Sequence, residues 1–321
     1  MTVARPILAA LRASVDAWQG FWFSPMAAST LALFRIAMGV LVFCWTLSLA
    51  PELSAMFSSK GILPRQPVGP GVWGLLGFIP GKIAVIALFS ALLVASACLV
   101  VGFWTRIMAV VVFVGVMSFE RRNPWVFSSG DGLIRNLAFF LMLAPAGAAL
   151  SVDRWRKARE RFWEFPLISA WPVRLLQVQL SILYLSTVWA KLRGMTWNDG
   201  TAVSYALRIA DLGRFRVLDF LAHSPLVTNA LTYATLAIEF SLGILVWNKR
   251  LRPWVLALGV LLHFGTGYVL RLGFFVPAIL TLYLAFLSPG AATRLILAAG
   301  SRLANSRLAR TRLRPFFSAV D

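Results

Sequence analysis

The sequence predicts an all-α fold of the polytopic integral membrane class, a bundle of about eight transmembrane helices with an amphipathic helix at each end. Hydrophobic residues make up 59% of the chain and charged residues only 13%, and the mean hydropathy is +0.78. These values lie well outside the range of soluble globular domains. Apolar runs long enough to cross a bilayer recur along the chain. Together the observations exclude a soluble enzyme.

The predicted elements follow one another as a terminal helix, a series of spans and a tail. Residues 1–25 predict an interfacial amphipathic helix, because Arg5, Arg12 and Asp16 interrupt its apolar residues and Trp18 stands near its end. A span needs roughly 20 apolar residues, which places spans at 26–50, 83–103, 107–119, 133–150, 172–190, 226–247, 253–270 and 274–288. Residues 291–321 predict a basic amphipathic cytoplasmic tail, in which Leu and Arg segregate at helical spacing.

The positive charge is distributed unequally between the two sides of this bundle. The chain has 31 Lys+Arg against 12 Asp+Glu, a formal charge of +19, which in a soluble protein would indicate a nucleic-acid partner. The larger share falls on the side that holds both termini, notably in residues 154–161, 249–252 and 294–314. The positive-inside rule therefore predicts a multi-pass protein of the cell membrane with both termini cytoplasmic. The expected partner is the lipid bilayer rather than nucleic acid, although an RNA-binding arm is the alternative for the tail.

Cysteine and histidine are too sparse for metal or disulfide chemistry. Cys44 and Cys98 both lie in apolar runs, and His223 and His263 are far apart in the sequence. Neither pair has the spacing of a redox motif or of zinc ligands. We expect no metal.

Ionisable side chains inside the predicted spans are the first functional candidates. Such groups are expensive in lipid and are rare without a role. Arg35, Arg135, Glu239 and His263 lie within spans, and Lys191 ends the fifth. Each also has a structural interpretation. Glu239 would form a buried pair with Arg35 or with Arg135, His263 would be an interhelical hydrogen-bond donor, and Lys191 would snorkel to the interface.

Asp131 is a further candidate just before the fourth predicted span. It stands in the segment Ser129-Gly-Asp131-Gly-Leu-Ile-Arg135. At this position its carboxylate suits either a helix N-cap or a site residue.

Five further segments stand out by their order and spacing. They are residues 129–135, Pro145-Ala-Gly147 with Ser151-Val-Asp153, residues 177–200, Glu239-Phe-Ser-Leu-Gly243, and His263 followed by Leu272-Gly273-Phe-Phe275. Together they resemble the family of horizontally transferred transmembrane (HTTM) domains, to which the vitamin K-dependent γ-glutamyl carboxylase belongs. The resemblance covers about residues 20 to 290 and implies an HTTM-like transmembrane domain over 26–290.

The resemblance implies a quinol cofactor, vitamin K hydroquinone or menaquinol, near the non-cytoplasmic face. In the carboxylase a lysine in a Lys-Leu-x-x-x-Trp-x-x-Gly segment is the base that acts on the quinol. The match here is Lys191-Leu-Arg-Gly-Met-Thr-Trp197-Asn-Asp-Gly200, which is one residue longer between Lys and Trp. The implied catalytic residues are Lys191, His263 and Asp131. The implied cofactor-binding residues are Trp197, Tyr184, Arg135, Arg35 and Glu239.

Two departures limit what the resemblance implies about activity. The carboxylase's catalytic histidine lies in an Asn-Asn-His-Ser-Tyr-Leu segment, and residues 128–133 here contain no histidine. We also expect no counterpart of its large lumenal domain. The expected function is a vitamin K-dependent carboxylase-like protein, a quinol-dependent lyase or oxidoreductase that modifies a peptide or small substrate. The alternative is an accessory membrane protein that works with a maturation partner on a secreted peptide and has no redox chemistry of its own.

Overall fold

The computed structural model describes residues 4–65, 73–215 and 219–304, and these are mostly helical. They divide into two compact units. Unit 1 comprises Met1–Phe127, Ile134–Leu176 and Leu287–Asp321, and unit 2 comprises Ser128–Leu133 and Gln177–Phe286. The all-α class expected from the sequence is confirmed.

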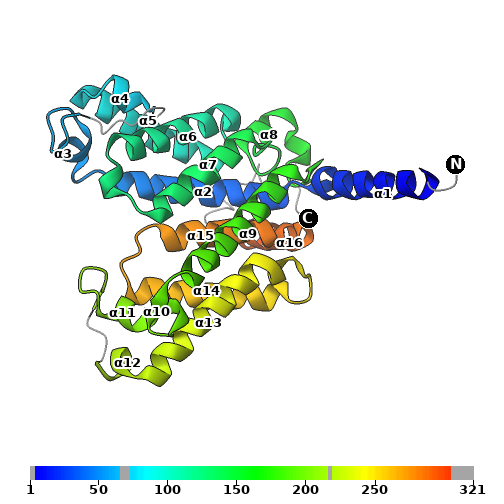
Figure 1. Ribbon diagram of the computed structural model, residues 1–321. Coiled ribbons are helices and arrows are strands. Elements are labelled where there is room, and N and C mark those ends of the chain that lie inside the picture. The colour runs from blue at the N-terminus through cyan, green and yellow to red at the C-terminus, as the bar shows by residue number, and fades with distance from the viewer. Residues whose placement is uncertain (1–3, 66–72, 216–218, 305–321) are drawn as a thin grey trace. The chain divides into compact units, whose positions relative to one another are not determined.

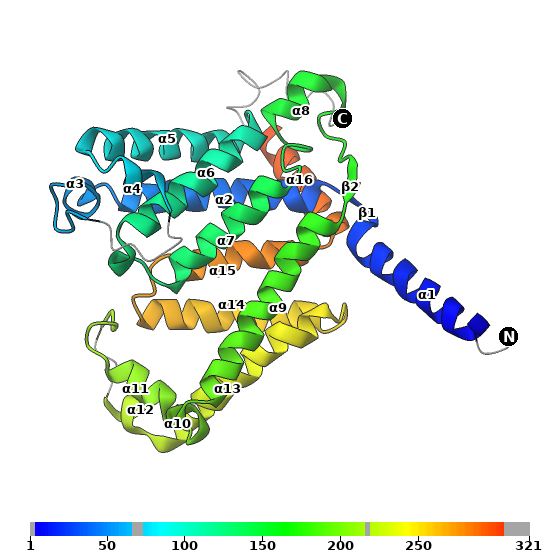
Figure 2. The same cartoon turned by 45° about the horizontal axis from the view of Figure 1, so that its top comes forward.

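Unit 1 is built around three long helices that lie side by side in Figures 1 and 2, α2 (Ser29–Ser48), α5 (Lys82–Val101) and α6 (Thr105–Arg122). Glycine allows the first two to approach closely, because a Cβ at Gly39 would lie 2.8 Å from the backbone nitrogen of Val100. Gly115 of α6 likewise packs against Leu92 of α5. The remaining elements are α1 (Ala4–Phe23), α3 (Leu53–Phe57), α4 (Leu75–Phe78), η1 (Pro124–Val126), most of α7 (Ser129–Leu143), α8 (Val152–Lys157), η2 (Arg159–Arg161) and α16 (Pro289–Ala304).

A short antiparallel ladder in unit 1 was not expected from the sequence. β1 (Pro25–Ala27) pairs with β2 (Leu167–Ser169), with Met26 opposite Ile168. It ties the start of α2 to the segment that precedes α9. Because each strand has only three residues, the ladder leaves the fold class unchanged.

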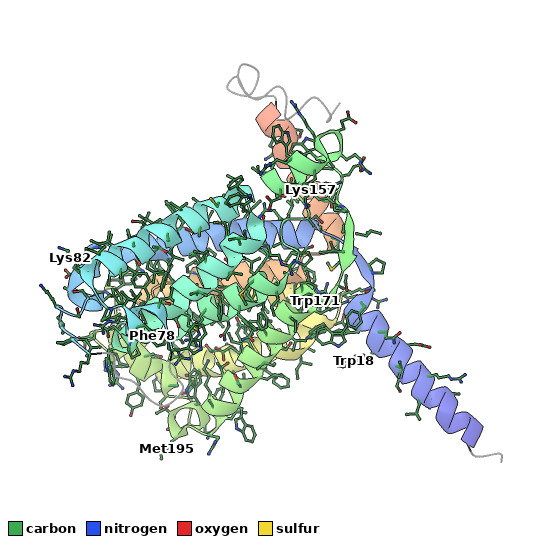
Figure 3. All side chains as sticks on the ribbon, turned by 90° about the horizontal axis from the view of Figure 1, so that it is seen from above. Trp18, Phe78, Lys82, Lys157, Trp171 and Met195 are labelled. Carbon is green, nitrogen blue, oxygen red and sulfur yellow. The ribbon has the colours of Figure 1, made fainter. Side chains whose placement is uncertain are left out.

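Helix α1 makes little contact with the rest of its unit. Residues 9–20 are all exposed, including Leu11, Val15 and Trp18, whose spacing puts them on one helical face. The Trp18 side chain projects from α1 in Figure 3.

Unit 2 contains most of α9 (Trp171–Leu192), with α13 (Pro225–Ile244), η3 (Leu245–Trp247), α14 (Arg252–Val269), α15 (Phe275–Tyr283) and η4 (Leu284–Phe286). Three short helices, α10 (Met195–Asn198), α11 (Ala202–Arg208) and α12 (Asp219–His223), connect α9 to α13 and gather near one end of α13 (Figure 2). Close packing between the long helices again uses glycine. Gly243 of α13 meets Leu185 of α9, and Gly259 of α14 meets Leu242 of α13.

Helices lie at the predicted spans, but the expected number of eight spans is not confirmed. Among the described residues, four helices, α2, α5, α9 and α13 extended by η3, are long and apolar enough to cross a membrane, or five with the bent pair Phe275–Phe286 and Pro289–Arg302. The fourth predicted span, 133–150, was too long, because α7 ends at Leu143, just before Pro145. Proline lacks the N–H that a continuing helix needs.

Candidate functional site

Lys191 and Glu239 form an ion pair in unit 2. The Lys191 Nζ donates a hydrogen bond to Oε1 of Glu239. Lys191 is the penultimate residue of α9, and Glu239 lies well inside α13. Their side chains are 22% and 9% exposed. The Lys191 ammonium therefore turns toward α13 and has a carboxylate partner there, while snorkelling to the interface stays a prediction.

The turn after α9 brings an aromatic ring to the same ammonium. The Gly194 N–H donates to the Lys191 carbonyl at 2.8 Å, and the chain reverses into α10. This places the Trp197 ring with its centroid 4.6 Å from Lys191 Nζ, a cation–π distance. The ammonium is thus held between a carboxylate and an indole ring.

Gly200 completes this turn by passing close to α13. Its φ is +81°, in the left-handed region that favours glycine. A Cβ there would also lie 2.6 Å from Oδ1 of Asn229 on α13. The Tyr233 hydroxyl donates to the Asn198 carbonyl at 2.9 Å. The segment from Lys191 to Gly200 is therefore fixed against the first half of α13.

Tyr184, Thr187 and Lys191 share one face of α9, because they are three and four residues apart. The Thr187 hydroxyl donates to the Tyr184 carbonyl at 3.0 Å and lies 3.5 Å from Oε2 of Glu239. The polar face of α9 is therefore continuous from Tyr184 to Lys191.

A buried imidazole and two phenols meet at the Tyr184 end of that face. The Tyr184 hydroxyl is 2.6 Å from His263 Nε2 on α14 and 2.6 Å from the Tyr283 hydroxyl on α15. All three residues are less than 9% exposed. Gly259, one turn before His263, makes room for this cluster, since a Cβ there would lie 2.6 Å from Tyr283 Oη.

Asp131 caps the start of α7. Its Oδ2 accepts hydrogen bonds from the Ser128 N–H at 2.6 Å and the Ser128 hydroxyl at 3.0 Å. Asp131 is the third residue of the helix, so it acts from inside the first turn and Ser128 stands at the N-cap position. Gly130 packs against the backbone of Phe275, whose ring contacts His263 edge-on at 5.5 Å. The capped turn of α7 thus adjoins the imidazole.

Arg35 and Arg135 belong to unit 1 and have other partners than Glu239. Arg135 forms an ion pair with Glu120 at 2.5 Å, so the two predicted pairs of Glu239, with Arg35 or with Arg135, are wrong. The partner of Glu239 depends on how the helices pack, which composition does not specify, so the sequence was equally consistent with either arginine.

Arg35 holds a turn of the backbone. Its guanidinium donates to the carbonyls of Ala146 and Ala149 at 3.2 Å and of Leu150 at 2.5 Å. Leu150 has a φ of +47°, which is unfavourable for a residue with a Cβ. Because Arg35 is fully buried and bonded to three carbonyls, it stabilises the 146–150 turn.

The Ser151-Val-Asp153 segment fixes the turn between α5 and α6. The Asp153 carboxylate accepts from the N–H groups of Trp104 at 2.9 Å and Thr105 at 2.8 Å. Burial tends to raise the pKa of Asp153, but these hydrogen bonds and the charge of Lys157 outweigh it, so the pKa lies below the ordinary value of 3.8. One of the five family-like segments, residues 145–153, therefore has a structural role in unit 1.

Sequence reasoning missed Tyr283 and Thr187. Tyr283 lies in the apolar run 274–288, where its hydroxyl was the available signal. Thr187 lies between two predicted site residues on the same helical face, and that spacing would have revealed it.

The fold and this cluster define a class, a helical membrane protein with an ion pair and an imidazole–phenol chain among its long helices. The family model of the HTTM domain matches residues 23–290, which is most of the chain. The chain therefore belongs to the HTTM domain family, which is related to the vitamin K-dependent carboxylase. No curated protein and no solved structure matches the chain significantly.

Proposed function

We propose that this protein is a quinol-dependent membrane enzyme of the carboxylase-like type, with Lys191 as its base. The observation that carries the proposal is the position of the Lys191 amine, which lies between the Glu239 carboxylate and the Trp197 ring at the end of α9. The amine has an acceptor for its proton in Glu239 and a flat apolar surface in Trp197.

The ion pair supplies a way to make a neutral amine. Transfer of one proton from Nζ to Oε1 converts ammonium and carboxylate into amine and carboxylic acid without separating charge. The Glu239 carboxylate lies next to the ammonium and is itself only 9% exposed, so it is placed to receive that proton. Lys191 Nζ then accepts a proton from a substrate hydroxyl, while Glu239 holds the first proton at Oε1.

The residues present fit a quinol head group. Binding sites for such ligands combine apolar walls with a few polar groups, and here the Trp197 ring adjoins the Lys191 amine. A bound quinol would supply the acidic hydroxyl and the reducing electrons. Trp197 would orient the ring, Lys191 would accept the proton, and Tyr184 with His263 would complete the polar wall.

Extraction of the purified protein tests the binding part of this proposal. Protein purified in mild detergent should yield menaquinone or ubiquinone in near-stoichiometric amount. Trp197→Ala should lower the yield at least tenfold, and Trp73→Ala, which alters an exposed indole of unit 1, should leave it unchanged. A wild-type protein free of quinone, or equal yields from both variants, would contradict the proposal and leave the accessory role in peptide maturation as the better one.

For the membrane topology we propose eight spans in the cell membrane with both termini cytoplasmic, so that Lys191 lies at the outer face. Helices at each predicted position support the count, including α6, α7 and α14. The exposed apolar face of α1 supports a place at the interface. The basic tail is predicted mainly by residues 305–321, which lie outside the described residues.

Cysteine labelling in intact cells tests this orientation. In a background without Cys44 and Cys98, a membrane-impermeant maleimide should label Arg193→Cys and spare Arg156→Cys. The reverse pattern would invert the topology and place Lys191 inside.

A further inference from the structure

The three side chains Tyr283, Tyr184 and His263 form a linear hydrogen-bonded chain through unit 2. They come from α15, α9 and α14, and each contact is 2.6 Å long. They are 7%, 1% and 4% exposed. Burial favours the neutral form of each group, so the chain has two phenols and one neutral imidazole.

The three hydrogen-bonded side chains carry one more proton donor than the hydrogen bonds between them use. The two hydroxyls and the imidazole carry three exchangeable protons, and only two hydrogen bonds join them. Within the part of the chain that the structure describes, neither the imidazole nor the Tyr283 hydroxyl has another hydrogen-bond partner. One N–H or O–H is therefore left over at one end.

Two arrangements of these protons satisfy the same two bonds. In the first, Tyr283 donates to Tyr184, Tyr184 donates to His263 Nε2, and the spare donor is Nδ1–H. In the second, Nε2–H donates to Tyr184, Tyr184 donates to Tyr283, and the spare donor is the Tyr283 O–H. Each leaves one donor without a partner inside the cluster, so the bond count favours neither.

We propose that Tyr283, Tyr184 and His263 form a proton relay. When a hydroxide ion removes the Nδ1 proton of His263 and becomes water, the Tyr184 proton moves to Nε2 and the Tyr283 proton moves to Tyr184 Oη. The Tyr283 oxygen then takes a proton from a water molecule at its end, which leaves as hydroxide. One proton has passed along the chain, every group is neutral before and after, and the reverse transfer restores the first arrangement.

The place of the relay beside Lys191 rests on the proposed function. Tyr184 and Lys191 share one face of α9, with Thr187 between them and close to Glu239. A site that moves a proton from a substrate to Lys191 and Glu239 must exchange protons with its surroundings before the next turnover. The relay provides buried groups for that exchange. Gly259 keeps the space in which the Tyr283 hydroxyl meets Tyr184.

Nitrogen-15 NMR of labelled histidine tests the relay without an activity assay. The chain has two histidines, so His223→Gln assigns the spectrum. In the wild type both tautomers of His263 should be populated, which gives each ring nitrogen a shift between the protonated and bare values. Tyr184→Phe removes the central hydroxyl and should leave a single tautomer. Tyr268→Phe alters an exposed tyrosine on α14, the helix of His263, and should change nothing. A single wild-type tautomer that Tyr184→Phe leaves unchanged would overturn the relay.

Turnover separates this proposal from the one on which it rests. Tyr283→Phe, which leaves the proposed quinol-binding residues unchanged, should slow quinol turnover at least tenfold with the fold intact, while a static structural cluster would affect stability alone. Full turnover in this variant would overturn the relay. If Lys191→Ala also retained full turnover, the proposed function would fail separately.

Discussion

Removing both partners of the Lys191–Glu239 pair should destabilise unit 2 by clearly less than the sum of the two single removals. Glu239→Gln leaves the Lys191 ammonium without its carboxylate, and Lys191→Met leaves the Glu239 carboxylate without its ammonium. The double variant contains neither charge. A double-mutant cycle isolates the interaction between the two side chains.

The burial of each side chain sets the expected magnitude. Breaking a fully buried pair costs about 3–5 kcal/mol. Lys191 is 22% exposed and keeps its contact with the Trp197 ring, worth roughly 0.5–2 kcal/mol, so Glu239→Gln should cost about 2–3 kcal/mol. Lys191→Met should cost about 3 kcal/mol, because Glu239 is only 9% exposed. The double variant should lose about 2 kcal/mol less than the sum.

Reversible unfolding in mixed micelles measures these differences. The free energies of unfolding of the wild type, both single variants and the double variant are obtained from titrations with a denaturing detergent. A coupling below about 0.5 kcal/mol is the value for exposed pairs. That result would refute the buried pair and with it the geometry assigned to Lys191.

Three further perturbations have defined outcomes. Arg35→Met removes the donor to three buried carbonyls and should cost about 3 kcal/mol or more in the free energy of unfolding; a cost below about 1 kcal/mol would contradict its role. Asp153→Asn should cost about 1 kcal/mol, as loss of a helix cap does. Because the pKa of Asp153 lies below its ordinary value, the stabilisation should be complete above about pH 4 and disappear as the pH falls through the folded-state pKa. A difference between wild type and Asp153→Asn that vanishes already at pH 6 would refute this. Gly259→Ala places a Cβ 2.6 Å from Tyr283 Oη, so histidine NMR should show the same single tautomer as Tyr184→Phe; unchanged histidine shifts would show that the contact is unimportant.

The apolar runs predicted the long helices because membrane insertion depends on composition over a long window. Helices α2, α5, α9 and α13 lie where that rule placed them. The end of α7 was missed because the run of apolar residues continues past Pro145, although the helix cannot. Backbone hydrogen bonding overrode hydropathy there, since residues 146–150 form the turn that Arg35 holds.

Several residues of the candidate cluster were singled out from the sequence, but their pairing was not. Lys191, Glu239 and Trp197 were each singled out, and the structure places them in contact. The partner of Glu239 depends on which face of α13 meets which helix, and a single sequence gives no measure of that rotation. Tyr283 was missed for the same reason, because its hydroxyl acquires meaning only beside the imidazole of His263.

Quinol turnover in membrane vesicles tests the central claim most directly. Vesicles with wild-type protein, Lys191→Ala or Lys249→Ala receive a naphthoquinol, and the oxidised products are quantified over time. Lys249 is an exposed lysine in the same unit, so Lys249→Ala controls for loss of charge alone. We predict turnover above that of protein-free vesicles for the wild type and Lys249→Ala, and a loss of at least a hundredfold for Lys191→Ala. Equal rates in all three preparations would contradict the assignment of Lys191 as the base.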